Sequence, residues 1–233
     1  MFPSWSPSGT HVAYQAAPRI PPSNMNDWAV MVRRADGSGR PDTVEAGGAL
    51  WPQITADGLH VVYTMGRMGQ PFDIRRRLLS GDVPPATILT STATPFFPRL
   101  SPDGRWLAYM EASYGALSGT EIHVCRYPSG EGRWQISSGG GLWPRWSERG
   151  DRIHFVRGEN MMEVTVGRGD PPEFGPPIRL FTRPSVNFDM PFEWTPMFAT
   201  RGERFLILRP VHGPGSESLV VWENWSAGIG DRR

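Results

Sequence analysis

The stretch FPRLSPDGRWLAY at residues 97–109 contains every part of a unit that recurs along the chain. An aromatic residue and a proline are followed by an apolar residue, a polar turn that ends in glycine, and an apolar strand. The matching segments are FPSWSPSG (2–9), WPQITADG (51–58), WPRWSERG (143–150) and TPMFATRG (195–202). Their prolines are spaced by 49, 46, 46 and 52 residues, a period that predicts a repeated four-stranded unit.

Each position of the unit has a physical role. Proline at the start of a strand removes no hydrogen bond that the sheet needs. The residue two positions after the proline is large and apolar in all five repeats, so we expect these side chains at equivalent buried sites: Trp5, Ile54, Leu100, Trp146 and Phe198. The closing glycines supply the positive φ of a tight turn: Gly9, Gly58, Gly104, Gly150 and Gly202. Asp57 and Asp103 are expected to stabilise two of these turns.

Further β-rich segments follow in each repeat. The second strands begin after the turn, as in HVAYQ (11–15), and the third and fourth follow, as in EIHVCR (121–126) and ATILTS (86–91). The whole chain predicts about nineteen strands and essentially no helix, in a single all-β domain that covers residues 1–233. The expected repeat boundaries are about 1–48, 49–94, 95–140, 141–190 and 191–233.

This pattern resembles the WD40-like repeat of TolB, the Tol–Pal translocation protein. The repeat also occurs in the propellers of prolyl-oligopeptidase-like enzymes and of bacterial Ser/Thr kinases. The tail, RFLILRP followed by SLVVWENWSAGI, resembles the last blade of the kinase-linked propellers. The resemblance implies a five-repeat β-propeller, a periplasmic or other extracytoplasmic location, and a fold that serves many functions.

The fifth repeat has no fourth strand, and TolB-like propellers usually have six blades. We therefore expect the chain to be a C-terminal piece of a longer propeller protein. The alternative is a five-bladed ring whose last blade has three strands.

Composition excludes several classes of function. The net charge is +1, so no overall field attracts nucleic acid or anionic lipid. All 24 basic residues are arginine, which excludes a Schiff-base lysine and a phosphate-loop lysine. A single cysteine, Cys125, forbids an intrachain disulfide and a multi-cysteine metal site. No apolar run approaches the length of a transmembrane helix, and residues 1–9 have neither the basic start nor the apolar stretch of a signal peptide.

No pattern for catalysis, a cofactor or a metal is present. The nearest approach to a G-x-S-x-G elbow, at residues 224–228, lacks its first glycine. The histidines are scattered: His11, His60, His123, His154 and His212. His11 and His60 share one repeat position, so we interpret them as scaffold. We expect a non-enzymatic protein with no catalytic residue, no cofactor and no metal.

Two sets of residues are candidates for ligand binding at the mouth of a propeller channel. The first is aromatic and opens the repeats: Phe2, Trp51, Phe97, Trp143 and Trp194. Such anchors suit a peptide or loop, and the alternative is packing between blades. The second set, Arg99 and Arg145, follows the repeat proline and suits a carboxylate, with an interblade hydrogen bond as the alternative. The arginine runs at 33–34 and 75–77 are expected on the solvated outer surface.

Three functions follow from these features. The first is a scaffold or sensory propeller that binds a protein or peptide, with a signalling domain upstream in the full-length protein. The second is a gating propeller beside a prolyl-oligopeptidase-like serine peptidase. The third is a hydrolase or lyase whose arginines, histidines and carboxylates meet in the channel. We expect the first.

Overall fold

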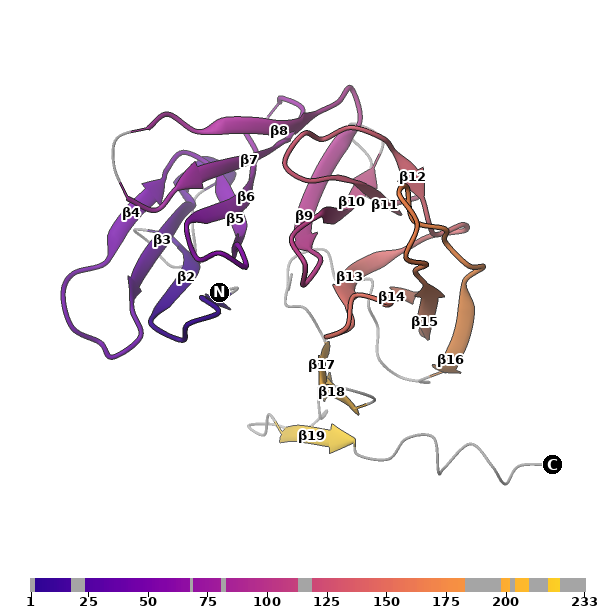
Figure 1. The fold of residues 1–233 in the computed structure, drawn as a ribbon. Coiled ribbons are helices and arrows are strands. Elements are labelled where there is room, and N and C mark those ends of the chain that lie inside the picture. The colour runs from indigo at the N-terminus through magenta and orange to yellow at the C-terminus, as the bar shows by residue number, and fades with distance from the viewer. Residues whose placement is uncertain are drawn as a thin grey trace. The chain divides into compact units, whose positions relative to one another are not determined.

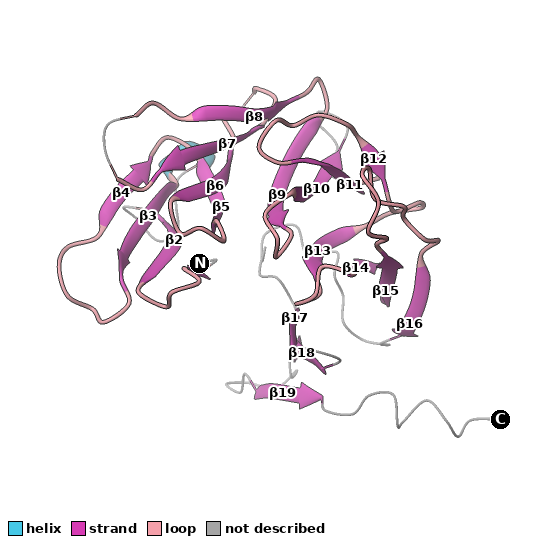
Figure 2. Ribbon diagram, in the orientation of Figure 1, coloured by secondary structure: helices cyan, strands magenta, loops and turns pink. Residues whose placement is uncertain are grey.

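The computed structural model describes residues 3–17, 24–67, 69–80, 83–112, 119–182, 198–201, 204–209 and 218–222. In the last three ranges it describes the backbone and, of the side chains, that of Phe205. Within these residues the chain forms nineteen strands in five antiparallel sheets (Figure 1). Strands dominate the described residues, and η1 (Met25–Asp27) is the one helical turn among them (Figure 2). The all-β prediction is confirmed.

Four of the sheets have four strands, and consecutive strands are neighbours in each. Sheet 1 consists of β1 (Ser4–Trp5), β2 (His11–Ala16), β3 (Ala29–Arg34) and β4 (Asp42–Glu45). Sheet 2 consists of β5 (Ala49–Ile54), β6 (His60–Met65), β7 (Asp73–Leu78) and β8 (Ala86–Thr90). Sheet 3 consists of β9 (Thr94–Leu100), β10 (Trp106–Ala112), β11 (Glu121–Arg126) and β12 (Trp134–Gln135).

The last two sheets follow the same order. Sheet 4 consists of β13 (Leu142–Trp146), β14 (Arg152–Arg157), β15 (Asn160–Thr165) and β16 (Ile178–Thr182). Sheet 5 has three described strands, β17 (Phe198–Arg201), β18 (Arg204–Arg209) and β19 (Ser218–Trp222). The chain divides into two compact units, Met1–Pro144 and Arg145–Arg233. Sheets 1 to 3 belong to the first unit.

The first unit is built by sheets that pack face to face. We call the face of a sheet that carries the apolar residue two positions after the repeat proline its leading face, and the opposite face its trailing face. The leading face of sheet 2, with Ile54, Val61 and Tyr63, packs on the trailing face of sheet 1, which contributes Ala13 and Val30. These side chains are almost fully buried.

The next junction repeats the arrangement one period later. Leu100, Leu107 and Tyr109 on the leading face of sheet 3 pack on Val62 and Ile74 of sheet 2. The repeat position therefore predicts burial correctly for Ile54, Leu100 and Trp146, which are 4%, 6% and 9% exposed. The side chain of Phe198 lies outside the described residues.

Trp5 is the exception, and the prediction that it is buried is wrong. Its side chain is 61% exposed. The other members of this position in the first unit are covered by the trailing face of the preceding sheet, whereas sheet 1 is the first sheet of that unit. Trp5 pairs with Val12 across the strands of its own sheet, and both lie on this leading face.

The turns that join the first and second strands have the predicted geometry. Gly9, Gly58, Gly104 and Gly150 have φ of 69°, 72°, 68° and 71°, which only glycine adopts without strain. In sheet 2 the Gly58 N–H donates to the Thr55 carbonyl at 2.9 Å. Asp57 accepts from the Leu59 N–H at 2.9 Å and from the Thr55 hydroxyl. These bonds hold the pKa of Asp57 below its usual value, the Thr55 bond contributing most.

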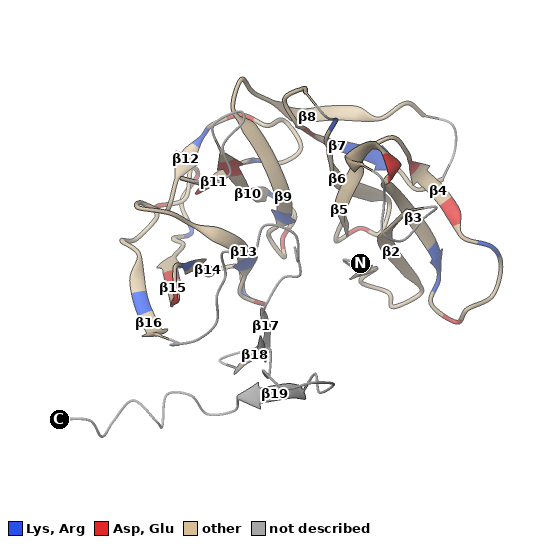
Figure 3. Ribbon diagram, turned by 180° about the vertical axis from the view of Figure 1, so that it is seen from behind, with Lys and Arg blue, Asp and Glu red and all other residues tan. Residues whose placement is uncertain are grey.

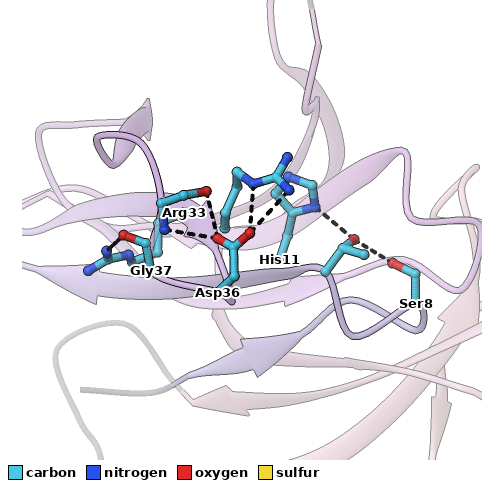
Figure 4. Close-up of polar contacts among 8 residues, drawn as sticks. Ser8, His11, Arg33, Asp36 and Gly37 are labelled. Atoms are coloured by element: carbon cyan, nitrogen blue, oxygen red, sulfur yellow. Dashed lines mark hydrogen bonds and ion pairs between the residues drawn. The ribbon is translucent and has the colours of Figure 1, made fainter.

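Polar contacts at the turn ends of sheet 1 are local (Figure 4). Asp36 accepts hydrogen bonds from the hydroxyl and the N–H of Ser38, and it forms an ion pair with Arg34. Together these contacts lower the pKa of Asp36. His11 shares a 3.0 Å hydrogen bond with the Thr10 hydroxyl. This contact fits the interpretation of His11 as scaffold.

The arginine run on β7 differs from the expected solvated surface (basic residues are blue in Figure 3). Arg75 pairs with Asp73 at 2.7 Å, and Arg77 pairs with Glu45 of sheet 1 at 3.5 Å. Both arginine side chains are only 29% exposed, because their strand lies against its neighbours in the first unit. Arg34, by contrast, is 59% exposed, as expected.

Candidate functional site

The opening strands of sheets 2, 3 and 4 share an unusual backbone at the aromatic residue before the repeat proline. Trp51, Phe97 and Trp143 have φ of 50°, 56° and 60°, in the left-handed region that costs an L-residue roughly 1–2 kcal/mol. In sheets 2 and 3 the residue sits in a β-bulge, between Leu50 and Gln53 opposite β6 and between Phe96 and Arg99 opposite β10. A bulge with an extra residue redirects the side chain of its strand.

The three aromatic side chains are buried and contact one another. They are 3%, 0% and 6% exposed in chain order. The rings of Trp51 and Phe97 meet edge to face at 6.1 Å between centroids, and those of Phe97 and Trp143 at 4.8 Å. The structure thus brings together three of the five aromatic residues singled out in the sequence. Phe2 and Trp194 lie outside the described residues, and a role of the set in ligand binding stays a prediction.

The backbone N–H of each of these aromatic residues is bonded to the preceding sheet. Trp51 donates to Oε1 of Gln15 at 3.1 Å, and Phe97 donates to Oγ1 of Thr64 at 3.2 Å. Trp143 reaches the sulfur of Met110 at 3.4 Å. The acceptors Gln15, Thr64 and Met110 all lie six residues after a turn glycine, so the strained backbone is held by a side chain at one repeat position.

A second crossing bond comes from the residue directly after the proline. Ser4 Oγ accepts from the Ile54 N–H at 3.2 Å, and Gln53 Oε1 accepts from the Leu100 N–H at 2.8 Å. In the next two repeats this position holds Arg99 and Arg145. A guanidinium has donors and no acceptor, so it cannot take over this bond. The two arginines therefore depart from the role that the position has in sheets 1 and 2.

Arg99 is held in a fixed orientation. It is 8% exposed, its guanidinium carbon lies 3.9 Å from the centroid of the Phe97 ring, and its Nη1 donates to the Pro98 carbonyl at 2.7 Å. Arg145, in the second unit, is partly buried, and desolvation lowers its pKa to about 10. Both guanidinium groups remain cationic at neutral pH.

Buried ionisable groups form two further clusters that the sequence does not reveal. In sheet 3, Glu111 lies beside His123 and Arg133. In sheet 4, Nε2 of His154 lies 2.9 Å from Oε2 of Glu163. Burial lowers the pKa of both histidines, against the opposing effect of the neighbouring glutamate. The partners come from different strands, and no local pattern could have pointed to them.

Clusters of metal-ligating side chains and membrane-spanning helices are both absent from the described ranges. No group of three or more histidine, cysteine, aspartate or glutamate side chains there could hold a metal ion. No helix in the same residues has the length and apolar character needed to cross a bilayer.

Neither a protein-family model nor a curated protein matches the chain by sequence. Solved structures do match by fold. TolB from Acinetobacter baumannii aligns with a TM-score of 0.58 and 17% identity, over 89% of this chain and 50% of that one. The chain has a TolB-like β-propeller fold.

Other propeller matches include enzymes. An oligogalacturonate lyase in complex with manganese aligns with a TM-score of 0.60 and 11% identity, over 91% of this chain and 62% of the lyase. Prolyl endopeptidase aligns with a TM-score of 0.57 and 16% identity, over 90% of this chain and 32% of the peptidase. At these identities the likeness shows the propeller fold alone. The chain spans half of the TolB chain and a third of the peptidase.

Proposed function

We propose that this propeller is a non-catalytic module that binds a protein or peptide, with Arg99 as the contact for a carboxylate of the partner. The observation that carries the proposal is the exchange at the position after the repeat proline. Ser4 and Gln53 use this position to bind the backbone of the next sheet, and Arg99 replaces them with a pure donor.

The surroundings of Arg99 suit recognition of a carboxylate. The Phe97 ring under the guanidinium and the Pro98 carbonyl at its Nη1 fix the plane of the group before a ligand arrives. A preset planar fork loses little side-chain entropy when it forms two parallel hydrogen bonds. The Phe97 ring belongs to a residue of positive φ, a backbone conformation that sheets 2, 3 and 4 share at this position.

Three glutamates pair with other side chains, which supports a binding role over acid–base catalysis by these groups. Glu45 accepts from the Tyr63 hydroxyl at 3.0 Å, Glu111 pairs with Arg133 at 2.8 Å, and Glu163 pairs with His154 at 2.9 Å. Each is already engaged by a neighbouring side chain within its own unit. A general acid or base must instead reach the substrate directly.

The experiment is a binding screen on an array of peptides with free C-terminal carboxylates, alongside the same peptides as C-terminal amides. We expect binding to a subset of the free acids, and Arg99→Gln should weaken it by about tenfold or more, the loss of one charge-assisted pair. The matched control is Arg105→Gln, since Arg105 is 60% exposed and pairs with Asp103 on a turn. Equal binding by Arg99→Gln and the unchanged protein would contradict the carboxylate contact.

Catalysis is tested on the same protein with peptide, ester, phosphate and glycoside substrates and an oligogalacturonate. We expect no turnover above background. A reproducible rate that disappears when one histidine or carboxylate is replaced would show that the propeller is an enzyme.

The second candidate is a gating propeller beside a serine peptidase, which the match to prolyl endopeptidase favours. The coding sequence that flanks this chain separates the two candidates. A downstream domain with a G-x-S-x-G elbow favours gating, whereas an upstream kinase or other signalling domain favours the binding module.

A further inference from the structure

A carboxylate is buried between sheets 2 and 3 and shared by three side chains. The Glu111 side chain is 3% exposed. Its Oε2 lies 2.9 Å from Nε and 2.8 Å from Nη2 of Arg133, and 3.5 Å from Nδ1 of His123. The other oxygen, Oε1, accepts from the Ser91 hydroxyl at 3.2 Å. Two different cations can therefore neutralise one oxygen, and only one of them is permanently charged.

The two side chains that can neutralise Glu111, those of His123 and Arg133, differ in their access to water. The His123 side chain is 7% exposed and stacks on the Tyr109 ring, with 5.7 Å between centroids. The Arg133 side chain is 59% exposed although its head reaches the buried carboxylate. The Arg133 head can thus exchange its contact with Glu111 for water once another cation neutralises the carboxylate, whereas His123 has no such access to water. His123 Nδ1 is buried and forms no hydrogen bond with the described residues.

The groups that face His123 come from several elements. On its own strand, Glu121 provides a backbone hydrogen bond and a negative charge, and its carboxylate also binds Ser137 and the Gly140 N–H. On β10 the neighbours are Tyr109 and Glu111. Ser91, directly after β8, binds Glu111 and is neutral, and Arg76 of sheet 2 lies near Tyr127.

Burial and the Arg133 charge lower the pKa of His123, burial having the larger effect, while the Glu111 charge raises it. At neutral pH the imidazole is therefore neutral and Arg133 balances Glu111. When the imidazole gains a proton, two cations compete for one carboxylate oxygen, and the more exposed cation is the one that can leave.

We propose that Glu111, His123 and Arg133 form an acid-sensitive latch on the edge of sheet 3. In the neutral state Arg133 closes the latch and fixes the start of β12, the two-residue strand that begins at Trp134. When His123 is protonated on Nδ1, Glu111 exchanges its ion pair with Arg133 for an ion pair with His123. Arg133 then moves to solvent, and β12 loses its anchor to the sheet, while Glu111 keeps its bond to Ser91 in the segment between β8 and β9.

The latch couples the titration of His123 to the local opening of β12. β12 pairs with β11 through Gln135 opposite His123 and Trp134 opposite Val124. The Ile136 N–H donates to the Ile122 carbonyl at 2.9 Å. Such a short outer strand has few hydrogen bonds of its own, so its protection against hydrogen exchange reports the state of Arg133.

The test combines histidine NMR titration with amide hydrogen exchange on the whole chain between pH 4 and 7. We expect the protection factors of the β12 amides and Ile136 to fall about tenfold over the range in which His123 titrates. Arg133→Gln should raise the pKa of His123 by about one unit and leave β12 poorly protected at every pH. Arg152→Gln, beside the other buried histidine–glutamate pair, is the matched control. It should change neither the pKa of His123 nor the protection of β12.

Two results would overturn the latch. One is a His123 titration that Arg133→Gln does not change. The other is β12 protection that stays constant while His123 becomes protonated. Because the Arg133 side chain is 59% exposed, we expect its replacement to leave the fold intact, so that the titration of His123 can be read in both proteins. His123→Gln adds a further check, since its β12 protection should not vary with pH.

Discussion

The junction between sheets 1 and 2 and the junction between sheets 2 and 3 share one plan but differ in the acidic residue that each contains. Both have an apolar cluster and two hydrogen bonds from the opening strand to the preceding sheet. At the first junction the acid is Glu45, from the preceding sheet, and is 19% exposed. At the second it is Glu111, from the following sheet, and is 3% exposed. The repeat thus determines the apolar and backbone contacts, while the acid is particular to each junction.

The largest expected effect tests whether a side chain on a covered leading face contributes more to the free energy of unfolding than one on an open leading face. Leu100→Ala should reduce the free energy of unfolding by about 2–5 kcal/mol, because it leaves a cavity between two sheets. Trp5→Ala, at the same repeat position, should cost below about 1 kcal/mol, because Trp5 is 61% exposed. Urea unfolding of both variants measures the difference. Equal losses would mean that the face of Trp5 is covered in solution.

A smaller effect is expected from the bonds that cross the junctions. Gln53→Ala leaves the Leu100 N–H without its acceptor and should cost about 1–3 kcal/mol. Ser4→Ala removes the equivalent bond to Ile54, which is longer at 3.2 Å than the 2.8 Å bond of Gln53, and should cost less. The same unfolding measurement ranks the two, and a reversed order would show that the junctions are not equivalent.

The smallest effect concerns the turn of sheet 2. The Asp57 carboxylate has a lowered pKa, so it stabilises the fold above its unfolded pKa of about 3.9, and this contribution disappears as the pH falls through its folded value. The turn of sheet 1 has Ser8 at this position and lacks the effect.

Asp57→Asn should reduce stability at pH 7 by less than about 1 kcal/mol, because the side chain is 54% exposed and water screens it. The variant should also lose part of the acid dependence of unfolding below pH 4. Melting temperatures between pH 2 and 7 test this, and an unchanged acid dependence would contradict the role of Asp57.

The repeat predicts the sheets well because its information is local. Proline, the turn glycine and the alternation of apolar residues each act within a few positions, so the strands and the burial of Ile54 and Leu100 follow from them. The prediction that Trp5 is buried was wrong, because burial depends on a neighbouring sheet as well as on the sequence pattern. The positive φ of Trp51, Phe97 and Trp143 was not predictable, since such residues disfavour that conformation by themselves.

The candidate site follows from the sequence only in part. The repeat identified an aromatic set and an arginine pair separately, and the structure places three of the five aromatic residues, Trp51, Phe97 and Trp143, in contact. The sequence gives no indication of the partners of Glu111 or Glu163, because these contacts join residues from different strands. His123 and His154 look like ordinary members of apolar strands.

The crossing bonds have a consequence for how such a chain can change over generations. Gln15, Thr64, Ser4 and Gln53 recognise the backbone N–H groups of the next sheet, and any residue except proline offers that group. These bonds therefore place no demand on the identity of the side chains that follow, as long as the buried positions such as Ile54 and Leu100 stay apolar. Two neighbouring repeats can share few identical residues and still dock in the same register.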